Sequence, residues 1–424
     1  MSQRQSIRGM HDILPNNTAH WQWLEQKITA LFARYQFREI RLPIVEHTEV
    51  FTRAIGQTTD VVEKEMYTFE DRNGDSLSLR PEGTAGVVRS VIQHGLLNPP
   101  GLKVWYQGPM FRHERPQRGR QRQFHQFGAE VFGLAEPAVD VELIALVDRL
   151  WRELGLSDDL SLEINSLGDP EDRQRYRQEL VDYLLPHESE LDEDSKRRLH
   201  TNPLRIFDSK VEKTQAIMAD APRFFETLGE PAREHFASVC TLLDQLGIQY
   251  RVNTGLVRGL DYYCRTVFEW VTDKLGAQGT VCAGGRYDGL VAMAGGKDVP
   301  GIGFAMGAER LLDLLSSKEH EAGLPPSVYW VGSAQVATLL EQAEALRTAC
   351  PDLCVGVDLV GGSLKSQFKR ADRSLSRFAL ILGEQEIANG TVQVKDLRTK
   401  EDQHTLRQED LAQYLAERLI ELKE

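Results

Sequence analysis

The chain has 424 residues, 41% of them hydrophobic and 27% charged, and its formal net charge is −13. This length exceeds a single hydrophobic core and predicts two or three domains of an ordinary globular protein. Nucleic-acid binders are usually basic, so the acidic balance restricts any such binding to local basic patches. The amino terminus lacks a secretory signal and no apolar run approaches membrane-spanning length, so a cytoplasmic location without membrane contact is expected.

The five cysteines are scattered along the chain, and the closest two, Cys350 and Cys354, have no second cysteine or histidine pair beside them. This spacing argues against a zinc site and against a disulfide framework. We therefore expect free thiols and no structural metal.

The first predicted elements are a helix and a strand. Apolar residues at helical spacing predict a helix that Asn17 or Thr18 caps. The strand that follows, at residues 37–46, contains Pro43, which cannot donate to a ladder and is expected at a sheet edge. Another subunit could pack at such an edge, although an ordinary helix and edge strand is the simpler interpretation.

A hairpin and a strand-to-helix junction follow. Asn73-Gly74 between two alternating arms predicts a β-hairpin. After it, Glu82, Gly83 and Thr84 lead into a helix, where Thr84 can be a simple cap and Glu82 a surface charge. A carboxylate, a glycine and a hydroxyl at this junction also suit an ammonium group, so both interpretations stay open.

A second hairpin is predicted over residues 103–132, because aromatic and apolar residues alternate on both sides of the loop RPQRGRQR. This loop has four arginines and no acid, which suits a polyanionic partner. On the return strand Gln126, Gly128 and Glu130 share one face, since side chains repeat every second residue. The glycine leaves space for a small ligand, although a solvated hairpin face is the alternative.

The next part of the chain alternates between helical and strand-like patterns. A helix at residues 140–154 and a strand at LSLEINSLG precede a charge-rich segment at about residues 170–240, which predicts a mostly helical insertion in a sheet domain. Two strand-like arms then carry unusually polar residues, among them Arg258 and Tyr263. Each of these is more often a satisfied structural residue than a functional one.

A glycine-rich strand, GIGFAMG, leads into a helix that contains Arg310. The spacing fits neither the dinucleotide fingerprint nor the phosphate loop. Arg310 can nevertheless project towards a site that the glycines leave open. After a linker at residues 324–326, alternating strands and helices predict a small α/β domain with parallel strands.

Four stretches together resemble one family: TDVVEKEMYTFEDRNGDSLSLRPEGTAG, FRHERPQRGRQRQFHQFGAEVFG, LVRGLDYY and GGRYDGL. The sequence is similar, over essentially its full length, to class II aminoacyl-tRNA synthetases, and in particular to bacterial-type histidyl-tRNA synthetases. The resemblance implies an α+β catalytic domain at residues 1–325, with a mostly antiparallel sheet flanked by helices and the helical insertion. It also implies a C-terminal α/β anticodon-binding domain at residues 326–424.

The resemblance implies a ligase that joins histidine to ATP as an adenylate and then transfers it to the 3′-terminal adenosine of tRNA(His). ATP is expected to arrive with Mg²⁺, and the segment ending in Pro43 implies a homodimer. Histidine would be bound by Glu82, Thr84, Gln126, Glu130, Arg258, Tyr262, Tyr263 and Tyr287. Arg112 and Arg258 would be catalytic at the α-phosphate. ATP would be bound by Arg112, Glu114, Phe124 and Arg310, and the tRNA acceptor end by Arg115, Gln117, Arg118 and Arg120.

One alternative belongs to a different functional class. A non-catalytic relative that regulates a histidine-biosynthetic phosphoribosyltransferase would bind histidine without activating it. Such relatives tend to lack the C-terminal domain and the phosphate arginines, whereas this sequence retains both, so the ligase is the leading hypothesis.

Overall fold

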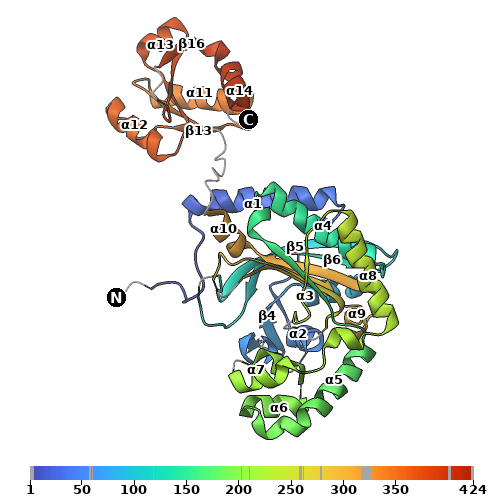
Figure 1. Ribbon diagram of the computed structural model, residues 1–424. Coiled ribbons are helices and arrows are strands. Elements are labelled where there is room, and N and C mark those ends of the chain that lie inside the picture. Colours follow the sequence, from blue (N-terminus) through green and yellow to red (C-terminus); the bar gives the residue numbers. More distant parts are fainter. Residues whose placement is uncertain are drawn as a thin grey trace. The chain divides into compact units, whose positions relative to one another are not determined.

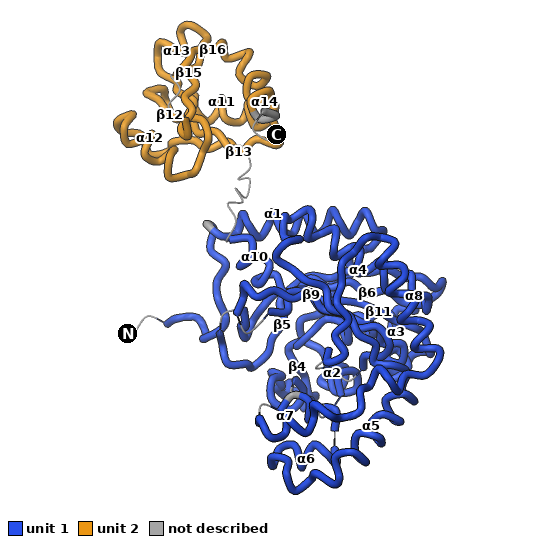
Figure 2. The backbone as a smooth tube through the Cα atoms, in the orientation of Figure 1, with its two compact units in different colours: residues 1–320 blue, residues 321–424 orange. Residues whose placement is uncertain are grey.

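The chain folds into two compact units, residues 1–320 and residues 321–424 (Figure 2). Each unit has its own hydrophobic core. None of the helices described below is long and apolar enough to cross a membrane. The computed structural model describes residues 4–56, 59, 61–117, 119–201, 203–209, 211–256, 260, 262–276, 279–316, 327–399 and 403–421.

An eight-stranded sheet, in the order β1-β5-β6-β11-β10-β9-β7-β8, organises the larger unit (Figure 1). Neighbouring strands are antiparallel except at the two ends, where β1 runs parallel to β5 and β8 parallel to β7. The predicted mostly antiparallel sheet is confirmed. The strands are β1 (Arg38–Glu39), β5 (Leu102–Phe111), β6 (Gln123–Phe132), β7 (Ser161–Ser166), β8 (Arg251–Val252), β9 (Cys264–Val271), β10 (Thr280–Arg286) and β11 (Gly301–Gly307).

One face of this sheet packs against four helices. Residues Ile302, Phe304 and Met306 of β11 point into this core, whereas the alternate positions Gly301 and Gly303 lie on the opposite face. The glycine-rich strand thus presents large side chains to the helices and an almost bare surface to the other side. The helices are α1 (Pro15–Arg34), α4 (Pro137–Glu153), α8 (Glu230–Gln245) and α10 (Ala308–Ser316).

Helix α1 begins earlier than the sequence pattern indicated. Pro15 occupies its first turn, Leu14 is the N-cap residue, and the Thr18 hydroxyl donates to the Leu14 carbonyl at 3.0 Å. The prediction that Asn17 or Thr18 caps the helix is wrong, because proline lacks the N–H that a cap would satisfy and already has helical φ.

The opposite face of the large sheet carries a second, three-stranded sheet in the order β2-β4-β3 and three helices. The predicted single strand at residues 37–46 is wrong, because the chain breaks around Pro43 and its two halves join different sheets. Both halves lie at sheet edges, as expected. The elements are β2 (Val45–His47), β3 (Tyr67–Glu70), β4 (Ser76–Leu79), α2 (Thr48–Ile55), α3 (Thr84–Gln93), α9 (Leu290–Met293) and the π-helical segment η1 (Val61–Glu65).

The predicted helical insertion has its own small core around Tyr176, Leu180 and Leu184. Helix α8 does not belong to this core; its side chains Phe236 and Val239 pack in the main core with α4. The helices of the insertion are α5 (Pro170–Leu184), α6 (Glu193–Thr201) and α7 (Glu212–Ala219), and its 3₁₀ segments are η3 (Leu185–Glu190), η4 (Pro203–Asp208) and η5 (Phe224–Thr227). A further 3₁₀ segment, η2 (Ser157–Asp159), precedes β7.

The smaller unit contains a five-stranded sheet in the order β13-β12-β14-β15-β16. The first three strands are parallel, as predicted, and the last two add antiparallel pairs. The elements are β12 (Ser327–Val331), β13 (Cys354–Val357), β14 (Phe378–Ile381), β15 (Thr391–Asp396), β16 (His404–Arg407), α11 (Val336–Ala349), α12 (Leu364–Arg373), α13 (Glu384–Asn389), α14 (Leu411–Glu421) and η6 (Gln408–Asp410).

Candidate active site

A cavity of about 290 Å³ lies on the face of the large sheet that the glycines of β11 leave bare. Gly303 and Gly307 line it, as do residues of the predicted hairpin and of the junction before α3. Segments up to 228 residues apart in the chain therefore meet here, from Glu82 to Arg310. The predicted site residues that line the cavity are Glu82, Thr84, Arg112, Glu114, Arg120, Phe124, Gln126, Tyr262, Tyr263 and Arg310.

The junction before α3 is held by the Glu82 carboxylate. It accepts hydrogen bonds from the backbone N–H groups of Thr84, at 2.7 Å, and Ala85, at 2.9 Å. Burial raises the pKa of Glu82, although these two hydrogen bonds oppose the shift. Thr84 is not the helix cap: Glu82 satisfies the first N–H groups, and the Thr84 hydroxyl is turned towards the sheet.

Glu130 is completely buried beneath this junction. Its carboxylate accepts from the Thr84 hydroxyl at 2.7 Å and from the Tyr287 hydroxyl. Gly303 lies opposite Glu130 in the sheet, and a Cβ atom there would be 1.6 Å from Glu130 Oε2. Burial raises the pKa of Glu130 to about 8, although the two hydroxyl donors favour the ionised form. Glu130 and Tyr287 stand behind the cavity wall that Thr84 forms.

Tyr106 is a wall residue that the sequence patterns did not single out. Its buried ring lies between Gly83 and Gly128, where added Cβ atoms would approach it to 2.1 Å and 2.2 Å. The expectation that Gly128 makes space for a ligand is therefore wrong, because Tyr106 fills that space. The signal was the register of the hairpin, in which Tyr106 pairs directly with Gly128; aromatic side chains commonly cover glycines across a strand pair.

Gln126 leaves a polar atom unsatisfied in the cavity wall. Its side-chain oxygen is buried and has no hydrogen-bond partner among the described residues. Native structures rarely leave such an atom unpaired. Together with the carboxylate of Glu82 and the hydroxyl of Thr84, which line the same cavity, this oxygen forms a set of acceptors suited to a small donor such as an ammonium group.

The other end of the cavity is rich in arginine. Arg112 donates from Nε to the Pro81 carbonyl at 2.9 Å and lies over the Phe124 ring, 5.5 Å from its centroid. Arg310 donates to the carbonyls of Gly119, at 3.0 Å, and Thr280. Burial lowers the pKa of Arg310, and the nearby positive charges of Arg120 and Arg112 lower it further. Cations held close together in this way are stabilised by an anion such as phosphate.

The hairpin tip folds against this arginine cluster. Gln117 and Arg120 form an isolated β-bridge, and Arg120 makes a 2.8 Å ion pair with Glu114. The structure thus joins a residue expected to contact adenine to one expected to contact tRNA. Arg115 and Gln117 are exposed, and the predicted site residues Arg118 and Arg258 lie outside the described residues.

Three tyrosines pack beside Glu130. The rings of Tyr262 and Tyr263 have centroids 4.6 Å apart, and that of Tyr262 lies 5.6 Å from Tyr287 at an interplanar angle of 77°. All three are buried. Burial raises the pKa of Tyr287 well above its usual value, and the charge of Glu130 adds to the shift. This end of the site is therefore aromatic, with polar groups in a few fixed positions, as is typical of small-molecule sites.

Glu309 is a second residue that the sequence patterns missed. It lines the cavity, and its carboxylate accepts from the backbone N–H of His125 at 3.0 Å and contacts the His125 ring at 2.9 Å. It thereby ties the start of α10 to the return strand of the hairpin. The sequence offered one indication of its role, since Glu309 directly precedes the predicted site residue Arg310.

Comparisons with known proteins agree with this architecture. A family model described as histidyl-tRNA synthetase matches residues 9–169 and 173–311, and one described as an anticodon binding domain matches residues 329–418. The histidine–tRNA ligase of Halorhodospira halophila is 57% identical over 412 residues, which are 97% of each chain. That of Alkalilimnicola ehrlichii is 57% identical over 417 residues, 98% of this chain and 97% of the relative.

A solved structure gives the same result in three dimensions. The crystal structure of apo histidyl-tRNA synthetase from S. aureus superposes with a TM-score of 0.81 at 35% sequence identity, covering 97% of this chain and 100% of that chain. The mostly antiparallel sheet with its arginine-lined cavity, together with the separate C-terminal unit, defines a class II aminoacyl-tRNA synthetase. The chain belongs to the histidyl-tRNA synthetase family. It is a ligase that activates histidine with ATP and transfers it to tRNA.

Proposed function

We propose that the cavity binds histidine and ATP side by side, with the histidine carboxylate facing the α-phosphate. The observation that carries this assignment is the unsatisfied side-chain oxygen of Gln126, which lines the cavity together with Glu82 and Thr84. The α-ammonium group of an amino acid supplies three donors and a positive charge. Bound here, it satisfies Gln126 and partly neutralises the buried carboxylate of Glu82.

The imidazole ring lies at the aromatic end, where Glu130 and Tyr263 bind its two nitrogens and Tyr262 and Tyr287 complete the pocket. Glu130 already holds the hydroxyls of Thr84 and Tyr287, so histidine joins or replaces one of these donors. An isosteric apolar side chain would leave Glu130 buried with fewer partners. Pockets built in this way reject the wrong substrate strongly.

ATP occupies the arginine-rich end. Phe124 stacks on adenine, Glu114 accepts from its amino group, and Arg310 binds the outer phosphates. Arg112 and Arg258 stabilise the α-phosphate while the histidine carboxylate attacks it. Two anions meet in this step, so positioning and positive charge contribute more than an acid or a base.

Mg²⁺ enters with ATP and takes most of its ligands from phosphate oxygens and water. Within the described ranges, no three His, Cys, Asp or Glu side chains are grouped as a metal site. Of the carboxylates at the cavity wall, Glu114 binds Arg120 and Glu309 binds His125. An ion held mainly by the nucleotide fits these residues, and the charge it adds complements that of the arginines.

The tRNA contacts involve the hairpin tip and the smaller unit. The acceptor end is bound by Arg115, Gln117, Arg118 and Arg120. When Arg120 binds tRNA, its ion pair with Glu114 breaks, and Glu114 is then free to bind adenine. Residues 326–424 contact the anticodon, and residues 1–325 form the catalytic domain that also contains the insertion. The protein works in the cytoplasm, where its tRNA and amino-acid substrates are found.

The assay that tests this assignment is ATP–pyrophosphate exchange followed by charging of tRNA. We expect exchange that depends on histidine and is negligible with the other amino acids, because only an imidazole satisfies Glu130 and Tyr263 together. Folded protein that shows no exchange with histidine would rule the assignment out. Exchange without tRNA charging would contradict only the proposed tRNA contacts and would leave the histidine and ATP assignments in place.

The protein is a homodimer in this proposal, and the three-stranded sheet supplies the interface. Its exposed face carries apolar side chains, Val45 at 38% exposure and Phe69 at 44%, while its buried face carries Glu46 and Ser78. An apolar face turned towards solvent on edge strands is typical of a surface that another subunit covers.

Phe69→Asp should convert the dimer to a monomer, because it places a charge in a desolvated apolar interface. Sedimentation velocity should give twice the chain mass of 48.0 kDa for the wild type and the single chain mass for the variant. Leu246→Asp is the matched control, since Leu246 is also exposed, at 56%, but lies outside this sheet. A dimer that survives the Phe69 change, or a monomeric wild type, would contradict the proposed interface.

A further inference from the structure

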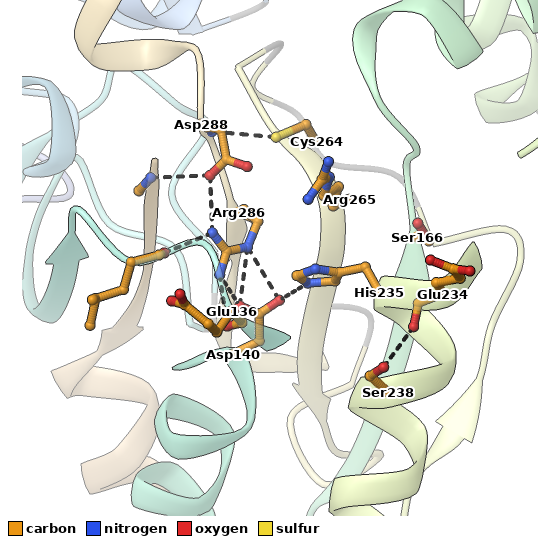
Figure 3. Close-up of polar contacts among 12 residues, drawn as sticks. Glu136, Asp140, Ser166, Glu234, His235, Ser238, Cys264, Arg265, Arg286 and Asp288 are labelled. Atoms are coloured by element: carbon orange, nitrogen blue, oxygen red, sulfur yellow. Dashed lines mark hydrogen bonds and ion pairs between the residues drawn. The ribbon is translucent and has the colours of Figure 1, made fainter. Parts of the chain in front are cut away.

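A buried cluster of charged side chains joins the end of β10 to helices α4 and α8 (Figure 3). Arg286 at the end of β10 and Asp140 on α4 are both completely buried, and His235 on α8 is 6% exposed. Asp288, two residues after Arg286, completes the cluster. None of these side chains lines the cavity, so the chemistry of the site leaves them unexplained.

Every nitrogen of the Arg286 guanidinium has a partner. Nε donates to Asp140 at 3.1 Å and Nη2 donates to the same carboxylate. Nη1 donates to Asp288 and to the Leu134 carbonyl, each at 3.1 Å. His235 Nε2 contacts Asp140 at 2.8 Å. A buried guanidinium is tolerated only when its geometry is fully compensated, so these contacts hold the end of β10 in one place.

The residue between Arg286 and Asp288 is Tyr287, which points the other way. Its N–H donates to the Gly301 carbonyl at 2.7 Å, while the Gly301 N–H donates to Asp288 at 3.1 Å. Its ring lies across Gly301, where a Cβ atom would approach the ring to 2.5 Å. The same turn that is clamped on the helix side therefore sets the direction of the Tyr287 ring on the cavity side.

Tyr287 transmits this position to Glu130. Gly301 and Gly303 are alternate residues on one face of β11. The Tyr287 ring lies over Gly301, and the Glu130 side chain lies over Gly303. The Tyr287 hydroxyl donates to Glu130, whose other oxygen holds Thr84. A shift of the turn would move the Tyr287 hydroxyl away from Glu130 Oε2, the oxygen that Thr84 does not hold, and would change the orientation of the carboxylate.

We propose that Arg286, Asp140 and Asp288 are positioning residues that set histidine specificity by fixing Tyr287, and through it the Glu130 carboxylate. These three residues, called the clamp below, contact neither substrate. They act on the imidazole end of the site and not on the ATP end. This inference rests on the proposed assignment of Glu130 to the imidazole.

The test uses Asp140→Asn and Asp288→Asn, which keep side-chain shape and remove one charge from the clamp. In pyrophosphate exchange, the KM for histidine should rise about 10-fold or more, because small displacements of a binding group are costly. The KM for ATP should stay within about 2-fold, because the arginine end does not depend on Tyr287. The side chain of Asp288 is 28% exposed, whereas that of Asp140 is 0% exposed. An asparagine at position 288 still accepts from the Gly301 N–H, so Asp288→Asn is the decisive variant if Asp140→Asn does not fold.

A double-mutant cycle with Tyr287→Phe separates positioning from general destabilisation. If the clamp acts through the Tyr287 hydroxyl, the effect of Asp288→Asn on the histidine KM should largely disappear in the Tyr287→Phe background. Effects that multiply independently, or equal increases in the KM values for histidine and ATP, would overturn the inference.

Asp358→Asn in the smaller unit is the matched control, because Asp358 is buried like Asp140 and, like it, binds an arginine: Arg370, at 2.6 Å. It should lower the unfolding temperature of its unit without changing either KM in exchange. A wild-type protein without histidine-dependent exchange would refute the proposed function itself, whereas active wild type with unaltered clamp variants would refute only the positioning role.

Discussion

Replacing Glu130 with glutamine is expected to raise the KM for histidine by about 10- to 100-fold, on the scale of one charged hydrogen bond in a buried site. The amide keeps the shape of the side chain and still accepts, through its oxygen, from one of the two hydroxyls of Thr84 and Tyr287, which donate to separate oxygens of Glu130. It presents an N–H donor where the imidazole also donates, however. The KM for ATP should change little, because the assigned ATP groups lie at the arginine end.

The same variant should be as stable as the wild type, or more stable, above neutral pH. Burial raises the pKa of Glu130 to about 8 from its ordinary value of 4.5. The folded protein therefore binds this proton more tightly than the unfolded chain does, so the wild type loses stability as the pH rises from 4.5 towards 8. Each pKa unit corresponds to about 1.4 kcal/mol, and glutamine, which does not ionise, removes this loss.

Urea unfolding at pH 5, 7 and 8 measures this effect. The free energy of unfolding of the variant should increase relative to that of the wild type as the pH rises. Glu163→Gln is the matched control, since Glu163 is also buried but binds Arg251 and Asn253 outside the cavity. It should leave the histidine KM unchanged. Equal losses of histidine and ATP binding in the Glu130 variant would count against imidazole recognition.

Arg112→Ala should lower the kcat of pyrophosphate exchange by about 100-fold or more, on the scale of removing one charge donor from a transition state. Arg112 is held by the Pro81 carbonyl and by the Phe124 ring, so its guanidinium is already oriented before substrate binds. A preoriented cation stabilises the charge that develops at the α-phosphate without reorganising during the reaction.

Steady-state kinetics separate the two roles of this side chain. Loss of transition-state charge lowers kcat, whereas loss of the contact with Phe124 raises the KM for ATP. Arg112→Lys should recover only part of the rate, because an ammonium group cannot reproduce the planar fork. Arg34→Ala, which breaks an exposed ion pair with Glu153 on the helical face, should leave both constants unchanged. Near-normal exchange by Arg112→Ala would refute its role at the phosphate.

Local patterns predicted the parts of the site that lie within one strand pair or one junction. Period-two alternation placed Gln126 and Glu130 on one face of the strand; Gln126 lines the cavity, and Glu130 lies behind the wall that Thr84 forms. The small residues of β11 predicted an open surface, and Gly303 and Gly307 line the cavity. These predictions succeeded because strand geometry alone dictates which side chains share a face.

Predictions about which group fills a space were less successful. Gly128 was expected to leave space for a ligand, but Tyr106 fills that space; of the two interpretations of Thr84, the simple cap is wrong, because its hydroxyl binds Glu130. In both cases the correct partner comes from another segment, and the sequence spacing carries no information about its distance. Glu114 and Arg120 were likewise assigned to different substrates, although the folded tip brings them together as an ion pair.

The sequence determined the central hairpin, the helical insertion and the family, and through the family the ligands, although it did not show that the segment around Pro43 divides between two sheets. The tertiary structure alone decided what surrounds Glu130: the hydroxyl of Tyr287 lies 157 residues away in the chain, and the clamp that directs it joins Arg286 to Asp140 across 146 residues. Burial is a property of the assembled core, and it is burial that shifts the Glu130 pKa and leaves the Gln126 oxygen without a partner among the described residues. No spacing rule reaches across such separations, because they depend on how the helices pack on the sheet.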